Sequence, residues 1–166
     1  LVKPRLLQVV EDVKKPKLAF VVQMDTSSEH DACRCVDAIL SQTLEGVVTI
    51  LMDAGASVEV SELCDSYAEF HKNVIVVHER EPLSLGVGMN AGLRIAQGMG
   101  AEFVSFVTPM SQMDMRAANN MVKKLQATGA DVACCGIQLH NTETLKRDEK
   151  FWNLLEPFYG DSQVDQ

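Results

Sequence analysis

The sequence predicts an α/β fold in which a sheet of about five mainly parallel strands carries helices on both faces. Short runs rich in β-branched residues alternate with segments of helical periodicity between residues 16 and 141, without an internal repeat or a linker. The runs are continuously apolar, as is typical of strands that are covered on both faces of a parallel sheet. The length of 166 residues suits a single domain.

The predicted strands share a high content of Val, Ile or Phe, and they lie at residues 18–24, 47–53, 74–78, 103–107 and 132–139. The first helix follows the first strand and has an apolar stripe at Ala32, Val36, Ile39 and Leu40. Thr26 and Glu29 have the spacing of a capping box at its start.

Two more helices have readable ends. Ser57 is the predicted N-cap of the second helix, with Glu59 in the first turn and a stripe at Val60, Leu63, Cys64 and Tyr67. Asp114 is the predicted N-cap of the fourth helix, which stops at Gly129 and presents Met115, Ala118, Val122 and Leu125.

The formal net charge of −8 opposes binding to nucleic acid or to anionic lipids, because these carry charge of the same sign. The longest apolar runs, such as residues 47–52, are too short to cross a bilayer, and no basic and then apolar leader opens the chain. We therefore expect a cytoplasmic protein that does not insert into membranes.

The cysteines do not have the spacing of a metal site. There are five, and neither Cys33 with Cys35 nor Cys134 with Cys135 can converge on one ion from a helix or a strand. Reduced thiols that serve as small hydrophobic side chains are expected.

The two ends differ from the middle of the chain. Residues 1–16 form an N-terminal extension with a short helical pattern closed by Pro16, the domain occupies residues 17–147, and residues 148–166 form an aromatic and acidic tail. The aromatic segment 151–159 either docks on the flank of the domain or offers a surface to a protein partner or a second copy of the chain.

Several short motifs of the sequence resemble motifs of one protein family. Residues 17–23 (KLAFVVQ) resemble the opening strand of family 2 glycosyltransferases, and residues 36–44 (VDAILSQTL) resemble their "CLDSILNQTL". The chain then has LMDAGA at 51–56 for "VDDGS", LGVGMNAGL at 85–93 for "LSAARNAGL", FVSFVTPMS at 103–111 for "YISFVDSDD" and GADV at 129–132 for "GADI". The resemblance covers about residues 17–140, with the motifs in the order and at the spacings of the family.

This resemblance implies a GT-A fold, whose Rossmann-like sheet binds a nucleotide-diphospho-sugar, with strand 18–24 at the centre between the strands that begin at Val47 and Phe103. In the family, a D-x-D motif holds a manganese or magnesium ion against the diphosphate, and a carboxylate of the acceptor half acts as base. We expect the acceptor half to be missing from this sequence.

Several functional positions depart from the family pattern. Thr108, Met110 and Ser111 replace the acidic residues after the fourth strand, and none of them supplies a carboxylate. Ala54 replaces the acidic residue credited with contacting the uracil, and Met89 replaces the arginine that approaches the phosphates. No metal cofactor is therefore expected.

The candidate nucleotide-binding residues are those at the motif positions: Gln23, Asp53, Gly55, Met89, Asn90, Thr108 and Met110. Asp53 is either a residual ligand contact or a strand-end residue that caps the turn at Gly55. Asp114 is a helix N-cap or, less in keeping with its position, a metal ligand.

Nothing in the sequence indicates a hydrolase. The chain has four histidines, at His30, His71, His78 and His140. None of them is paired in the sequence with Cys33, Cys64 or a nearby Ser in a way that would mark a nucleophile.

Two functions remain open. The first is a non-catalytic, glycosyltransferase-like module, a pseudoenzyme that binds ligands or acts as a scaffold in a larger protein. The second is an active or residual transferase that uses a UDP-sugar in an atypical, metal-independent way. In both cases UDP or a UDP-sugar is the expected small-molecule partner and is held weakly.

Overall fold

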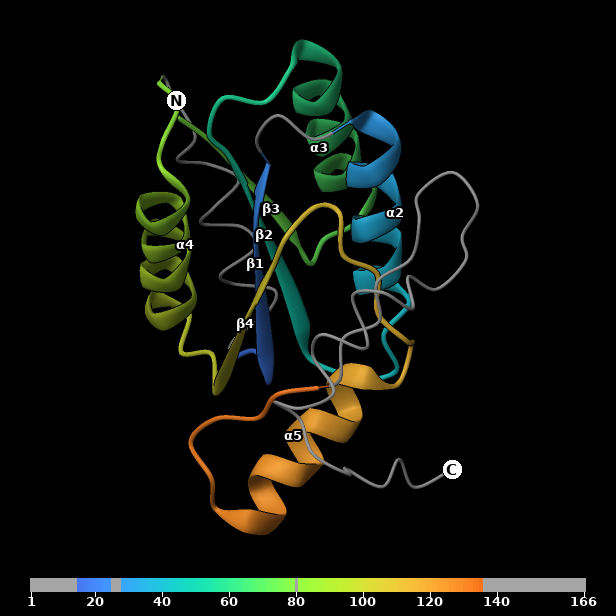
Figure 1. The fold of residues 1–166 in the computed structure, drawn as a ribbon, viewed down its shortest axis with the longest axis vertical. Helices are drawn as coiled ribbons and strands as arrows, with labels where there is room; N and C mark the ends of the chain where they lie inside the picture. The colour runs from blue at the N-terminus through green and yellow to red at the C-terminus, as the bar shows by residue number, and fades with distance from the viewer. Residues whose placement is uncertain (1–14, 25–27, 80, 136–166) are drawn as a thin grey trace, which may run out of the picture. The chain divides into compact units, whose positions relative to one another are not determined.

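The computed structural model describes residues 15–24, 28–79 and 81–135. It contains a sheet of four parallel strands in the order β3-β2-β1-β4 (Figure 1). The strands are β1 (Leu18–Met24), β2 (Val47–Asp53), β3 (Val74–His78) and β4 (Phe103–Val107). The α/β class, these strand positions and the central place of β1 between β2 and β4 are confirmed.

The register of the sheet brings three strand ends to one level. Met24 of β1 lies opposite Asp53 of β2, and Asp53 lies opposite His78 of β3. Because the strands are parallel, their carboxyl ends share one edge of the sheet, which is where open α/β sheets bind ligands.

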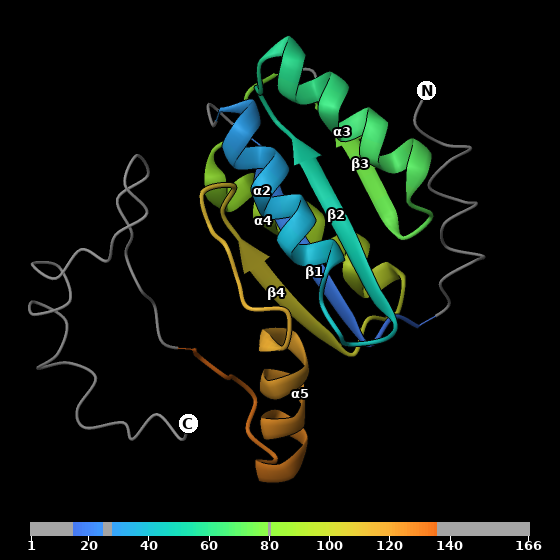
Figure 2. The same cartoon turned by 90° about the vertical axis from the view of Figure 1, so that its right-hand side faces the viewer.

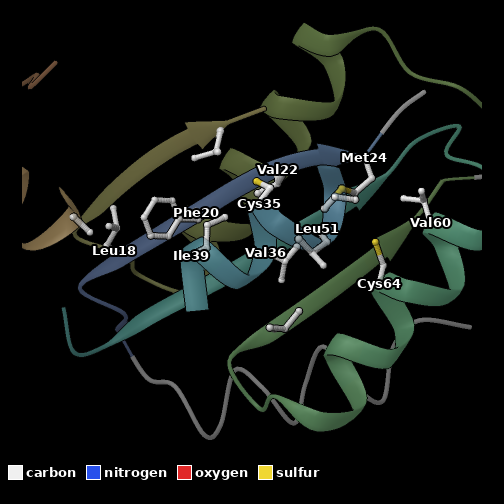
Figure 3. Close-up of a cluster of buried hydrophobic side chains, with 14 residues drawn as sticks. Leu18, Phe20, Val22, Met24, Cys35, Val36, Ile39, Leu51, Val60 and Cys64 are labelled. Carbon is white, nitrogen blue, oxygen red and sulfur yellow. The ribbon is translucent and has the colours of Figure 1, made fainter. Parts of the chain in front are cut away.

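Helices cover both faces of the sheet, as the sequence predicts. α2 (Glu29–Leu40) and α3 (Val58–Phe70) lie on one face, and α4 (Leu85–Gly98) lies on the other (Figures 1 and 2). On the first face, side chains of β1 and β2 such as Phe20 and Leu51 pack against Val36 and Ile39 of α2 and Cys64 of α3 (Figure 3). Burial of these apolar side chains is the main stabilising term of the fold.

The α4 face has a second core cluster, formed by Ala19, Val21, Val48, Ile50, Met52, Ile75, Ala96 and Met99. Gly92 permits the close approach of α4 to the sheet, because a Cβ atom at this position would overlap Cγ1 of Val21. Gly92 is therefore required by the close packing of α4 against β1.

α2 begins at a different cap from the predicted one. Its N-cap is Ser28, whose hydroxyl accepts a hydrogen bond from the Asp31 backbone N–H at 3.1 Å, so the Thr26–Glu29 capping box is wrong. Thr26 itself lies outside the described residues. Ser28 and Asp31 have the same three-residue spacing, moved by two positions, so pattern alone does not separate the two starts. The Ser57 cap of α3 is confirmed.

α5 (Ala117–Thr128) buries Ala118 and Val122 and ends at Gly129 with φ +66°, as expected. The predicted N-cap is wrong, because the helix starts three residues after Asp114. The Asp114 carboxylate instead accepts a hydrogen bond from the Arg116 backbone N–H at 2.9 Å, which is the short-range turn that Asp side chains favour. Met115 therefore precedes the helix and is exposed.

The predicted fifth strand is not formed by Val132–Cys135, the residues of this segment that the structure describes. Within the described residues β4 is an edge strand that pairs with β1, and Val132–Cys135 do not pair with it. An apolar, β-rich run alone does not establish that a segment joins the sheet. The rest of the predicted strand, the N-terminal extension up to residue 14 and the 148–166 tail with its 151–159 segment lie outside the described residues.

Within the described part of the chain, no helix combines the length and the apolar character that crossing a bilayer requires.

Candidate functional site

The candidate site lies at the carboxyl edge of the sheet. All the predicted site residues are among those that the structure describes. Gln23 and Asp53 are near the ends of β1 and β2, and Gly55 is in the turn after β2. Met89 and Asn90 lie in the N-terminal half of α4. The loop after β4 contains the other two predicted residues, Thr108 and Met110.

Asp53 forms the best-defined polar contacts of this edge. Its Oδ2 atom accepts a hydrogen bond from Ser61 Oγ of α3 at 2.7 Å and lies 2.6 Å from His78 Nδ1 of β3. The Asp53 side chain is 11% exposed. Its carboxylate therefore joins β2, β3 and α3, and does not cap the turn at Gly55.

His78 lies between two carboxylates. Its Nε2 atom is 3.2 Å from Asp65 Oδ1 of α3, while Nδ1 faces Asp53. Partial burial lowers the pKa of His78, but the hydrogen bonds and charges of Asp53 and Asp65 raise it by more, so the pKa lies above its ordinary value of 6.5. The protonated ring is the form that can donate to both partners.

The contact of His78 with Asp53 was not predicted from the sequence, where His78 was considered only as a possible partner of a nucleophile. Asp53 and His78 are 25 positions apart along the chain, and only the register of β2 against β3 brings them together. Both are the last residues of predicted parallel strands, and this shared position was the available signal.

Ser61, His78 and Asp53 do not form a hydrolase triad. A triad needs the serine at one ring nitrogen and the carboxylate at the other. Here Ser61 Oγ lies 3.4 Å from Nδ1, which already faces Asp53, and Nε2 faces Asp65. The cluster therefore does not activate a nucleophile.

Gln23 links β1 to the segment that leads into α4. It is 2% exposed, and its Nε2 atom donates a hydrogen bond to the Leu83 carbonyl at 3.0 Å. A Cβ atom at Gly88 would overlap Gln23 Oε1, so this glycine permits the close approach of the first turns of α4. Met89 and Asn90 follow directly. Gly55, with φ +105°, packs beside Pro82 in the same way.

Hydrogen bonds within the loop after β4 connect Thr108 and Ser111. Thr108 Oγ1 and Ser111 Oγ are 2.8 Å apart, and the Ser111 backbone N–H donates to the Thr108 carbonyl at 2.9 Å. Met110 is 74% exposed. Divalent cations of the Mg²⁺ type prefer carboxylate and water oxygens, and a thioether is a poor ligand for them. These residues do not fit the metal site of a D-x-D motif.

Asp114, the acidic residue considered as a metal ligand, follows this loop in the chain. Its side chain is 66% exposed and lies 3.8 Å from Arg116 Nε. Among the described residues, no group of three or more His, Cys, Asp or Glu side chains is arranged to hold a metal ion.

The cysteines are free thiols. Burial raises the pKa of both Cys35 and Cys64 to about 12, so these two thiols stay protonated at neutral pH and pack as hydrophobic side chains. Cys134 and Cys135 are exposed, in contrast to the buried role expected of them.

Residues 26–165 match the family described as Glycosyl transferase family 2. Among curated proteins, the chain is similar to Glycosyltransferase GlyG of Streptococcus pneumoniae, with 26% identity over 98 residues, or 59% of this chain and 32% of that protein. It is also similar to the uncharacterized glycosyltransferase EpsJ of Bacillus subtilis, with 22% identity over 66% of this chain and 30% of EpsJ. The chain thus spans about a third of the length of these relatives.

Two solved structures have a similar fold. The crystal structure of S. aureus TarS 1–349 in complex with UDP matches with a TM-score of 0.62 and 16% identity, over 74% of this chain and 38% of that one. The mannosyltransferase PcManGT from Pyrobaculum calidifontis, in complex with GDP-Man and Mn²⁺, matches with a TM-score of 0.58 and 16% identity, over 85% and 39%. At such identities the likeness concerns the fold.

Proposed function

This chain belongs to the family 2 glycosyltransferases, and on that basis we propose that it binds a nucleotide-diphospho-sugar at the carboxyl edge of its sheet without catalysing sugar transfer by itself. Structures with the same fold support the ligand class, since TarS was solved with UDP and with UDP-GlcNAc, and PcManGT with GDP-Man. The edge formed by β1, β2 and the start of α4 is where open sheets of this type take ligands.

We assign the parts of the ligand to the candidate residues as follows. Asp53, the last residue of β2, and Gly55, in the turn after it, are assigned to the base, together with Gln23 near the end of the neighbouring strand β1. Asn90 and Met89 lie near the start of α4, where backbone N–H groups and the helix dipole favour phosphate. Thr108 and Met110 stand beside the diphosphate, at the positions of the D-x-D motif.

One observation carries the non-catalytic part of the proposal. Thr108 and Ser111 bond to each other, and Met110 between them is exposed, at the positions where the family places acidic metal ligands. A leaving diphosphate gains negative charge in the transition state, so an active site must place cations or donors there. Neutral side chains fixed by their own contacts do not meet that need. Binding is therefore weak, independent of metal and without turnover, as in a ligand-binding or scaffolding module of a larger protein.

An atypical, metal-independent transferase is the second candidate. The observation in its favour is Asp53, which is retained, buried and ordered by two partners at the strand end. Because the chain spans 32% of GlyG, such activity would be a property of the whole protein, with an acceptor-side base supplied from elsewhere.

A turnover assay distinguishes the two candidates. We expect no release of UDP from UDP-glucose, UDP-galactose or their N-acetyl forms by this chain, with or without manganese. Asp53→Asn serves as the matched variant, since it keeps the shape of the side chain and removes its charge. Turnover that requires manganese and disappears in Asp53→Asn would show that the chain is an enzyme. Turnover without metal that depends on Asp53 would favour the second candidate.

A further inference from the structure

His78 has a role that the family motifs do not indicate. Both of its ring nitrogens face carboxylates, Nδ1 at 2.6 Å from Asp53 Oδ2 and Nε2 at 3.2 Å from Asp65 Oδ1. The ring thus bridges the last residue of β2 and the middle of α3. Only the imidazolium has a proton on each nitrogen, so only this form donates to both carboxylates at once.

Loss of one proton disturbs the bridge whichever nitrogen loses it. If Nδ1 keeps its hydrogen, the Nε2 lone pair points at the Asp65 carboxylate and repels it. If Nε2 keeps its hydrogen, the Nδ1 lone pair opposes Asp53. In either case the combined formal charge of His78, Asp53 and Asp65 changes from −1 to −2 at the edge where an anionic nucleotide is proposed to bind.

Among the described residues, the charged groups that face His78 are all acidic. Asp53 comes from β2, Asp65 from α3, and Glu79 follows His78 in the chain. Cys64 of α3 lies near the same two carboxylates, whose charges add to burial in raising the pKa of its thiol. Among these described groups, the proton on His78 is the source of positive charge.

We propose that His78 is a positioning residue of the nucleotide site, whose protonated ring holds the Asp53 carboxylate in place, so that nucleotide binding weakens when the ring loses a proton. This inference rests on the proposed nucleotide-binding function. It adds a residue and a pH dependence that the motif positions do not contain. Its sign is fixed by charge: the anionic ligand favours the protonated state, and deprotonation reduces affinity.

The test uses UDP-glucose, because its diphosphate diester has no group that titrates near neutral pH, unlike the terminal phosphate of UDP. We would titrate the full chain by calorimetry between about pH 5.5 and about pH 8.5. The dissociation constant is expected to rise with pH, by up to about tenfold per pH unit above the His78 pKa. His78→Asn keeps an N–H near the Nδ1 position but cannot titrate, so its dissociation constant should stay constant over this range. His71→Asn, at the C-cap of α3, is the matched control and should retain the wild-type profile.

A second measurement does not depend on a variant that folds. Linkage is reciprocal, so saturating UDP-glucose should raise the His78 pKa observed by NMR in the wild-type chain. An unchanged His78 pKa, or the same pH profile in His78→Asn as in wild type, would overturn the inference. Affinity that is independent of pH in wild type would also overturn it and leave the proposed function standing. Absence of binding at every pH would overturn the proposed function and the inference together.

Discussion

Asp53 and His78 form a hydrogen-bonded pair at the carboxyl edge of the sheet, where the candidate site lies. The Asp53 carboxylate is nearly buried, and a buried charge is tolerated only where hydrogen bonds compensate for the lost water. Ser61 and His78 supply these bonds. The same contacts fix the direction in which the carboxylate points at the strand end.

The raised pKa of His78 predicts a pH dependence of stability. A group whose pKa is higher in the folded state adds stability that is complete below its unfolded pKa of about 6.5 and is lost as pH rises through the folded pKa. Wild type should therefore exceed His78→Asn in free energy of unfolding near pH 5.5 by more than it does near pH 9. The effect stays below about 1 kcal/mol, because the ring is 37% exposed and water screens the pairs.

Urea unfolding of both proteins at the two pH values measures this difference, and the contributions of the other histidines cancel in the comparison. An advantage of wild type that is equal at both pH values would contradict the assigned contacts of His78.

At the scale of elements, α4 depends on two glycines that a helix would otherwise disfavour. Gly88 lies against Gln23 and Gly92 against Val21, whereas a Cβ at Gly98 of the same helix would meet no atom within 4 Å. Helical glycine costs about 1 kcal/mol relative to alanine, so close packing must justify the first two.

This difference predicts opposite effects of one substitution at two positions of α4. Gly92→Ala should lower the free energy of unfolding by about 1–3 kcal/mol, because the new methyl group overlaps a buried side chain of the central strand. Gly98→Ala should be neutral or stabilise by up to about 1 kcal/mol. Thermal or urea unfolding compares them directly. Equal stability of the two variants would show that α4 does not approach β1 as closely as described.

The strands and the apolar faces of the helices were predictable from this sequence, because buried positions are occupied by apolar residues in a regular pattern. β1 is buried along its whole length, and its seven residues contain no charge, so the strand follows from pattern. Its central place followed from right-handed crossovers together with the strand order that the family resemblance implies. Helix starts were less predictable. Thr26 and Ser28 both have side chains that can cap α2, and local chemistry alone does not choose between them. Asp114 can also cap a helix, but α5 begins three residues later. Val132–Cys135 form no strand, which shows that an apolar run alone does not establish pairing with the sheet.

The candidate site was predictable only as a set of positions. The motifs locate Gln23, Asp53, Asn90 and Thr108 at strand ends and helix starts, and the structure places them there. What the sequence could not provide is which side chains touch. The contact of Asp53 with His78 depends on strand register, and the contact of Thr108 with Ser111 depends on the path of a loop.

For the whole molecule, family membership and activity are separate matters. Residues 26–165 match the family 2 glycosyltransferases, while the loop after β4 presents Thr108, Met110 and Ser111, which have no carboxylate. A fold can persist while the chemistry of its site is replaced, because the core residues and the ligand residues are different sets.

We propose that the site binds a nucleotide-sugar without metal, and a calorimetric titration of the wild-type chain with UDP-GlcNAc, once in EDTA and once in millimolar manganese, tests this. We expect weak binding with the same dissociation constant, within about twofold, under both conditions, because no carboxylate pair links a metal to the diphosphate. Binding that appears only with manganese, or that manganese tightens by about tenfold or more, would contradict it, as would the absence of binding in both buffers.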